Sequence, residues 1–312
     1  MSRTHLAPCA HCGIEAALKC AGCIGAPEYQ PGDSVAVSYC ARDCQGEHWS
    51  RHKAYCNGMR QRKKLLRAAL ILKAALLTYR EVLFDIELTN IKFQDGVLYL
   101  HQKQRPVTAR SIRRPFPENL TTVIEHREAA LAINQCTTAM ALLGRLTRKL
   151  LAGVASTIEL LDLHIGRPLA PSRLIPGPDS TSCPHTVLKI GRLFASEAWI
   201  FDITGCQYGF REVLVPYNKY IADKECRLFN EPTTYDATET KDLDYFATLP
   251  FMIGTRSQQQ NIEKERRSRL HFSMFVNENV SQNLLDGSDT DFKSKLNKFG
   301  LDLKTHMLDH VK

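Results

Sequence analysis

The sequence predicts an α+β protein, in which a small metal-stapled module precedes a mixed helical domain with a small antiparallel sheet. Seven of the eleven cysteines fall within the first 56 residues. Residues 59–88 and 117–152 repeat apolar side chains at helical spacing, whereas 186–190 and 198–203 are rich in the β-branched and aromatic residues typical of strands. We therefore expect three parts: a metal-binding module over residues 1–58, a linker helix over 59–90, and an α+β domain of unknown function over 91–312.

The overall composition is that of a soluble globular protein. The 312 residues are 44% hydrophobic and 24% charged. The most apolar stretch, residues 65–77, is interrupted by Arg67 and Lys73 and is shorter than the roughly 20 residues that a membrane span needs. The first residues lack the apolar core of a signal peptide. We expect no membrane association and a cytoplasmic or nuclear location.

The cysteine-rich start has the spacing of a metal site. Structural zinc takes four ligands in a tetrahedron and prefers cysteine thiolate and histidine nitrogen. The first four candidates form two Cys-x2-Cys pairs, and the last four form two pairs spaced i, i+4, which lie on one face of a helical turn. Four pairs make two closed sites, so we expect two structural Zn²⁺ ions; the spacing leaves three pairings open. The candidate ligands are Cys9, Cys12, Cys20, Cys23, Cys40, Cys44, His52 and Cys56.

Residues 39–56 resemble the MYND family of zinc fingers. The match rests on Tyr39 before the fifth ligand, the Cys44-Gln45 pair, Trp49, and the ending His52-Lys53-Ala54-Tyr55-Cys56. The resemblance implies an interleaved arrangement, in which the first and third ligand pairs share one zinc and the second and fourth share the other.

The same resemblance implies a protein partner. MYND fingers mostly bind short proline-containing peptides, here through Gln45 and Trp49, and this argues against sequence-specific nucleic-acid recognition. Sixteen residues separate Cys23 from Cys40, more than is usual in the family. We expect Gly25 to Asp33 to loop out of the finger and to alter its partner-binding surface.

The helix expected after the finger has a basic face. Its seven cations raise the possibility of nucleic-acid binding, but a solvated face on a docking helix is the more ordinary interpretation. The formal net charge is +8. Two zinc ions add four positive charges and seven thiolates remove seven, so the loaded protein stands near +5, which argues against nucleic-acid binding. The cations are Arg60, Arg62, Lys63, Lys64, Arg67, Lys73 and Arg80.

One constellation in the larger domain points to an enzyme. Cys136, His185 and Asp202 resemble, in order and rough spacing, the cysteine, histidine and aspartate of transglutaminase-like and papain-like enzymes. In those enzymes a helix start and a histidine partner lower the pKa of the thiol and make it a nucleophile. Two features depart from that pattern: no tryptophan follows Cys136, and residues 121–151 can form one continuous helix that buries the thiol at its middle.

The remaining patterns describe structure. Residues 202–209 resemble a segment that follows MYND fingers in fungal proteins of unassigned activity, and we expect them to form a turn on the strand pair. Asp95-Gly96 predicts a hairpin, residues 166–184 a long surface loop, and residues 256–269 and 292–311 helices. The sequence thus favours a zinc-dependent protein-interaction adaptor without enzymatic activity. The alternative is a cysteine-dependent acyl-transfer or hydrolase enzyme of transglutaminase-like fold.

Overall fold

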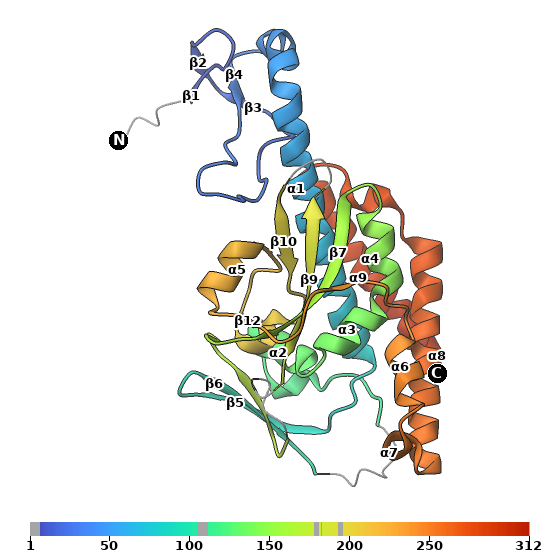
Figure 1. Cartoon of the computed structure of the whole chain (residues 1–312). Helices are drawn as coiled ribbons and strands as arrows, with labels where there is room; N and C mark the ends of the chain where they lie inside the picture. Colours follow the sequence, from blue (N-terminus) through green and yellow to red (C-terminus); the bar gives the residue numbers. More distant parts are fainter. Residues whose placement is uncertain (1–6, 105–111, 178–180, 182, 193–195, 312) are drawn as a thin grey trace.

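The chain folds into a zinc-finger module at one end of a long helix and an α+β body built around the rest of that helix (Figure 1). In this computed structural model the described residues are 7–104, 112–177, 181, 183–192 and 196–311. The α+β class expected from the sequence is confirmed. No helix in these ranges is long and apolar enough to cross a membrane.

The finger is made of short strands and the start of the first helix. Strands β1 (Ala7–Pro8) and β2 (Glu15–Ala16) form one antiparallel pair, and β3 (Leu18–Lys19) and β4 (Ser38–Tyr39) form another. Helix α1 (Arg42–Val82) begins directly after them. Such a segment has few apolar residues to bury, so the ligand clusters take the place of a conventional core.

Helix α1 joins the finger to the body without interruption. Its first turns carry finger residues, and further along it Leu65, Ile71, Leu72 and Leu76 are completely buried in the main core. The helical spacing recognised from residue 59 is therefore the second half of a longer helix. Its continuity gives the finger a rigid attachment to the body.

Most of the basic face of α1 is buried, although Arg60 is exposed and Lys64 is half-buried. Arg62, Lys63, Arg67 and Arg80 are all at most 8% exposed. Arg67 pairs with Asp289, and the other three bind carboxylates or backbone carbonyls of neighbouring segments. Cations held in this way are unavailable for phosphate contacts, which removes the main argument for nucleic-acid binding.

The main sheet is antiparallel, with strand order β11-β10-β9-β7-β12 and with β13 also paired to β7. Alternate residues of β9 and β10 face opposite sides. Leu188 and Trp199 enter the large core with α1, whereas Val187 and Ile200 enter a smaller core beside helix α5 (Tyr217–Asp223). The strands are β7 (Ala155–His164), β9 (His185–Arg192), β10 (Ala198–Phe201), β11 (Leu214–Pro216), β12 (Arg227–Leu228) and β13 (Thr233–Thr234).

A second sheet contains the hairpin expected at Asp95-Gly96. Strands β5 (Leu88–Gln94) and β6 (Val97–Gln102) are joined by these two residues, whose φ angles of 51° and 77° are those of a tight hairpin turn. Strand β8 (Ser172–Ile175) pairs with β6 in parallel. The expectation of a structureless loop over 166–184 is therefore wrong at β8, because pairing with a distant strand leaves little local signal.

The expected continuous helix over residues 121–151 is instead three helices. After the 3-10 turn η1 (Glu118–Leu120), the chain forms α2 (Ile124–Ala132), α3 (Cys136–Leu142) and α4 (Gly144–Leu151). Asn134 adopts φ 55°, which a helix interior does not allow, so the helix breaks between Ala132 and Cys136. Cys136 is consequently the first residue of a helix.

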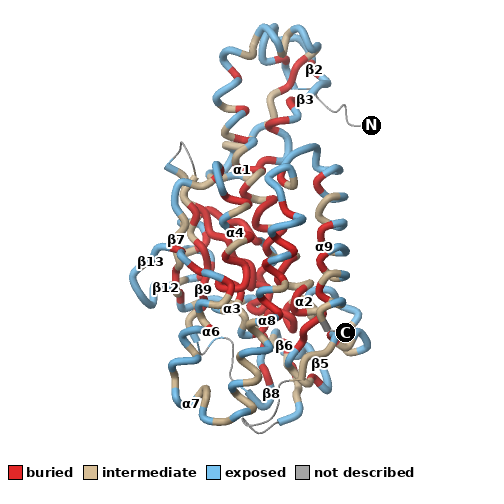
Figure 2. The backbone as a smooth tube through the Cα atoms, turned by 90° about the vertical axis from the view of Figure 1, so that its right-hand side faces the viewer, coloured by how far each residue is buried: buried red, intermediate tan, exposed pale blue. Residues whose placement is uncertain are grey.

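Helices from the C-terminal half pack on α1 and α4. Helix α9 (Asp289–Val311) packs along α1 and against α8 (Arg256–Asn279), whose start has a capping box formed by Thr255 and Gln258. Figure 2 shows the buried backbone concentrated between the sheet and these helices. The remaining elements are η3 (Gly205–Tyr208), α6 (Lys241–Phe246), α7 (Pro250–Ile253) and η4 (Gln282–Leu285).

Candidate functional site

Eight finger side chains form two compact ligand groups. One group contains Cys9, Cys12, Cys40 and Cys44, the other Cys20, Cys23, His52 and Cys56, and the ligand atoms of each group lie within 4.8 Å of one another. This is the interleaved pairing that the family resemblance implied.

The spacing within each group fits zinc. Two thiolates bound to one tetrahedral zinc at about 2.3 Å lie about 3.8 Å apart. The Sγ–Sγ distances are 3.5 Å for Cys12–Cys40 and 3.7 Å for Cys20–Cys56, and His52 Nε2 lies 3.3 Å from Cys23 Sγ. Both groups supply four protein ligands, so neither zinc would keep a position for water or substrate. Their role is structural.

Residues around the second ligand group orient its members. Gln45 Nε2 donates to Cys20 Sγ at 3.9 Å, and the half-buried Trp49 ring lies edge-on to His52 with a centroid distance of 6.0 Å. Tyr39 and His48 are joined through Tyr39 Oη and His48 Nδ1 at 3.0 Å. The two side chains expected to bind a partner therefore also contact zinc ligands.

The long segment between Cys23 and Cys40 docks onto the body instead of looping out. The Tyr29 ring packs on Trp199 with a centroid distance of 5.2 Å, and Asp33 pairs with Arg62 at 2.7 Å. Arg62 also pairs with Glu197 at 2.8 Å. The expectation that Gly25 to Asp33 projects from the finger is wrong, because one buried guanidinium joins this segment to the main sheet.

The body contains a second candidate site, to which three elements each contribute one side chain. Cys136 is the first residue of α3, His185 the first residue of β9, and Asp202 follows β10 directly. His185 Nε2 lies 2.8 Å from Asp202 Oδ1, and Cys136 Sγ lies 3.9 Å from the carbonyl oxygen of Pro184. The structure therefore brings together all three residues of the constellation.

The carboxylate of Asp202 is held from two sides. Its Oδ2 accepts a hydrogen bond of 2.7 Å from the Tyr220 hydroxyl, and its Oδ1 faces the imidazole. Asp202 and His185 are 2% and 0% exposed. An acceptor fixed on Nε2 leaves His185 Nδ1 available to the thiol, and Nδ1 has no hydrogen-bond partner in the described chain. The sequence had not singled out Tyr220.

The charges of this group favour a thiolate. Burial by itself raises the pKa of the Cys136 thiol, but the His185 imidazole outweighs it and lowers that pKa to about 7. Burial likewise opposes a charged imidazole, yet the Asp202 carboxylate raises the pKa of His185 to about 10. Although burial disfavours its charge, the pKa of Asp202 is lowered by the imidazole. At neutral pH His185 is therefore protonated, and about half of the Cys136 thiol is ionised.

Cys136 is half-buried and opens onto a cavity of about 430 Å³. Among the described residues of the lining, Asp162 is the one formally charged side chain, and its Oδ1 accepts a hydrogen bond of 2.7 Å from Thr186. A cavity of this size accommodates part of a peptide or a small acyl compound. The lining residues are Asn134, Cys136, Thr137, Asp162, Cys183, Pro184, Thr186, Gln207, Tyr208 and Phe229.

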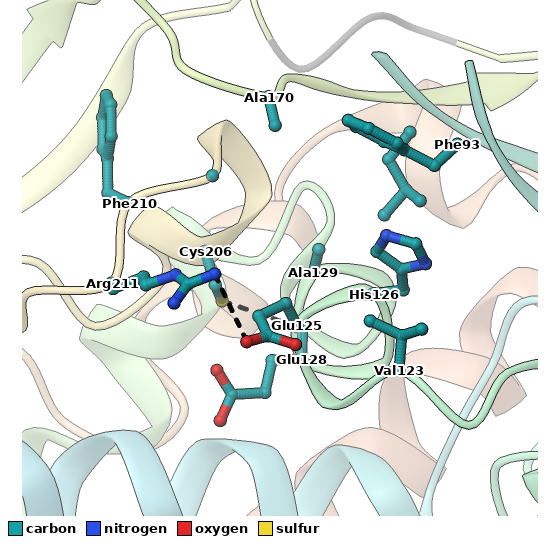
Figure 3. Close-up of a pocket in the computed structure, with 12 residues that line it drawn as sticks. Phe93, Val123, Glu125, His126, Glu128, Ala129, Ala170, Cys206, Phe210 and Arg211 are labelled. Carbon is teal, nitrogen blue, oxygen red and sulfur yellow. Dashed lines mark hydrogen bonds and ion pairs between the residues drawn. The ribbon is translucent and has the colours of Figure 1, made fainter. Parts of the chain in front are cut away.

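A separate cavity of about 300 Å³ lies between α2, the β5–β6 hairpin and the chain after η3 (Figure 3). Arg211 pairs with Glu125 at 3.4 Å across one side, and His126 packs on Phe93. The cavity contains the thiol of Cys206, whose pKa burial raises to about 12. Cys206 is therefore a protonated, inert thiol, in contrast to Cys136.

Comparison with known proteins identifies the finger. The family model of the MYND finger matches residues 9–56, which contain both ligand groups. These residues are therefore a MYND-type zinc finger with two zinc sites, a class of module that generally mediates protein–protein contacts. No curated protein and no solved structure matches the chain.

Proposed function

We propose that the protein is a zinc-dependent interaction module whose finger binds a short proline-containing segment of a partner protein. The observation that supports this most is the pair of closed zinc sites within a MYND match. Sites of this kind perform no chemistry, and what they maintain is the shape of a small surface.

The binding surface proposed here follows the exposed side of α1 in the finger. Gln45 and Trp49 lie one turn apart on it. An open hollow on α1, whose lining includes neither of these two side chains, is formed by Gly32, Asp33, Val35 and Val37 of the docked segment and by His48, Arg51, His52 and Tyr55. Val35 is 64% exposed at this hollow. An apolar side chain beside aromatic rings is a suitable contact for proline, whose ring packs on aromatic faces.

A selection experiment tests this proposal. Zinc-loaded protein is exposed to a displayed library of nine-residue peptides with a central proline, in parallel with Trp49→Ala. Zinc content is measured for both, because Trp49 contacts a ligand. We expect enrichment on the wild type and its loss in a variant that keeps both zinc ions. Arg42→Ala, at the exposed start of the same helix, serves as the control. Equal enrichment on Trp49→Ala would reject this surface.

A second function is favoured by one specific observation, the alignment of Cys136, His185, Asp202 and Tyr220. We propose that the body is a cysteine-dependent acyl-transfer or hydrolase domain. The thiolate attacks a carbonyl carbon, and the protonated His185 Nδ1 then gives its proton to the leaving group. Asp202 holds the imidazole in the required orientation, as a buried carboxylate does in Ser-His-Asp sites.

Site-mapped alkylation tests the thiol proposal. Wild type and His185→Gln are treated with iodoacetamide from pH 5 to 9, and modification of each cysteine is followed by mass spectrometry. Cys226 is an internal control, because burial raises the pKa of its thiol to about 12. We expect fast reaction of Cys136 near neutral pH and a slower one in the variant. A wild-type Cys136 that reacts no faster than Cys226 would rule out an activated nucleophile.

A further inference from the structure

A buried amide beside the thiol has an unused donor. Gln207, in η3, is 1% exposed and lines the same cavity as Cys136. Its Oε1 accepts a hydrogen bond of 3.1 Å from the backbone N–H of Asn134, two residues before Cys136. Its Nε2 has no partner among the described residues. The bond to Oε1 fixes which end of the amide is the donor.

An unpaired buried N–H is unfavourable and needs an explanation, because buried donors are nearly always satisfied. The other polar lining groups differ from Gln207. Asn134 and Thr137 are exposed, and the Thr186 hydroxyl already donates to Asp162. Among the described residues that line this cavity, Gln207 Nε2 is the buried side-chain nitrogen or oxygen that has no hydrogen-bond partner. A ligand oxygen would satisfy it.

We propose that Gln207 Nε2 is the oxyanion donor of the thiol site. This inference rests on the proposed acyl-transfer or hydrolase function. When Cys136 Sγ forms its bond to the carbonyl carbon, the π electrons of the C=O bond move to oxygen, and Gln207 Nε2–H donates to that oxyanion. When the C=O bond re-forms, the leaving group departs with the bond electrons and takes the proton from His185. A thioester remains on Cys136.

The substrate class follows from this donor and from the charge of the lining. It is an acyl compound, such as an ester, thioester or amide, because thiolate attack on its carbonyl carbon develops an oxyanion that this donor can bind. Asp162 is the formally charged lining residue, so a carboxylate close to the reacting carbonyl is disfavoured. A neutral aryl ester is therefore the appropriate first probe.

Two reactions of one thiol separate a catalytic role of Gln207 from a structural one. Acylation by p-nitrophenyl acetate passes through an oxyanion, whereas alkylation by iodoacetamide is a substitution at saturated carbon and does not. Both rates are measured at Cys136 in the full-length zinc-loaded protein, at a pH where the thiol is fully ionised. The variants are Gln207→Met, which loses both functions of the amide, and Gln207→Glu, which keeps an acceptor for Asn134.

We expect acylation to fall by about 10²-fold or more in both variants, the usual loss when one oxyanion donor is removed, while alkylation keeps its wild-type rate. Gln135→Met is the matched control. It is the neighbouring glutamine, its Nε2 donates to the carbonyl of Ile133, and its loss should change neither reaction.

The other outcomes overturn the inference in distinguishable ways. Equal losses of acylation and alkylation would mean that Gln207 only supports the start of α3 through Asn134. Wild-type rates of both reactions in both variants would show that Gln207 has no part in the chemistry. A wild-type Cys136 that is inert to both reagents would reject the thiol function itself, and the oxyanion role with it.

Discussion

Removing the Arg62 guanidinium should release the docked segment between Cys23 and Cys40 from the body. The side chain is 6% exposed and bridges Asp33 of the finger and Glu197 beside β10. Two of its nitrogens lie 2.8 and 2.7 Å from the two oxygens of Asp33, the forked geometry that makes arginine–carboxylate pairs strong. Arg62→Ala removes both pairs at once.

The free energy lost in Arg62→Ala is smaller than the loss for a fully buried ion pair. Removing one partner of such a pair costs about 3–5 kcal/mol. Glu197, however, keeps Arg192 at 2.8 Å, and Asp33 is 29% exposed and still accepts the backbone N–H groups of Tyr29 and Gln30. We therefore expect about 2 kcal/mol, which corresponds to a roughly 30-fold increase in the population of the undocked segment.

Hydrogen exchange measures this population directly. In the regime where opening is a fast equilibrium, amide exchange of residues 26–37 should accelerate by about 30-fold in Arg62→Ala, while the amides of β9 keep their wild-type rates. In Arg62→Lys the exchange rate of these amides should lie between those of wild type and Arg62→Ala, because lysine keeps the positive charge but cannot bind both carboxylate oxygens in the forked geometry. Lys53→Ala, an exposed cation of the same helix, is the control. Unchanged exchange in residues 26–37 would refute the idea that Arg62 holds this segment.

Three further predictions concern the thiol site and the zinc ions. The alkylation rate of Cys136 should rise with pH around a midpoint of about 7, and Asp202→Asn should move that midpoint upward, because a neutral amide no longer raises the pKa of His185. Gly205→Ala should also raise the pH midpoint of Cys136 alkylation, because a Cβ there would lie 2.3 Å from Asp202 Oδ2 and displace the carboxylate. An unchanged midpoint in either variant would contradict this arrangement. A strong chelator should release two zinc ions and expose the seven finger thiols to a colorimetric thiol reagent. The near-ultraviolet circular dichroism of the body should persist. Release of only one ion would contradict the two-site arrangement.

The finger was the part of this molecule most open to prediction, and the reason is chemical. Zinc ligands must be cysteine or histidine at short fixed spacings, so residue type and spacing identify the eight ligands, whereas their division into two sites was implied by the family resemblance. No residue-type rule of this kind specifies what the docked segment between Cys23 and Cys40 contacts. Asp33 and Arg62 are ordinary surface residue types in a sequence, and only the fold shows that they meet.

The body was predictable where the signal is local. The β5–β6 hairpin follows from Asp95-Gly96, which tolerates the φ angles of a tight turn. Strand β8 was missed because its partner β6 lies about 70 residues away and pairs in parallel, a contact that leaves no local pattern. The break before Cys136 depends on Asn134 at φ 55°, a conformation that asparagine tolerates but does not require.

The docking contacts of the finger and the thiol site lie at opposite ends of the same strand pair, and this limits how they can communicate. Arg192 and Glu197 contact Gly58 and Arg62 of α1 at one end of this strand pair, whereas His185 and Asp202 lie at its other end. Seven residue steps of β9 place about 24 Å between the two ends. Groups this far apart without shared partners act additively, so Arg62→Ala should leave the alkylation rate of Cys136 unchanged. A changed rate would mean that docking of the finger is transmitted along β9.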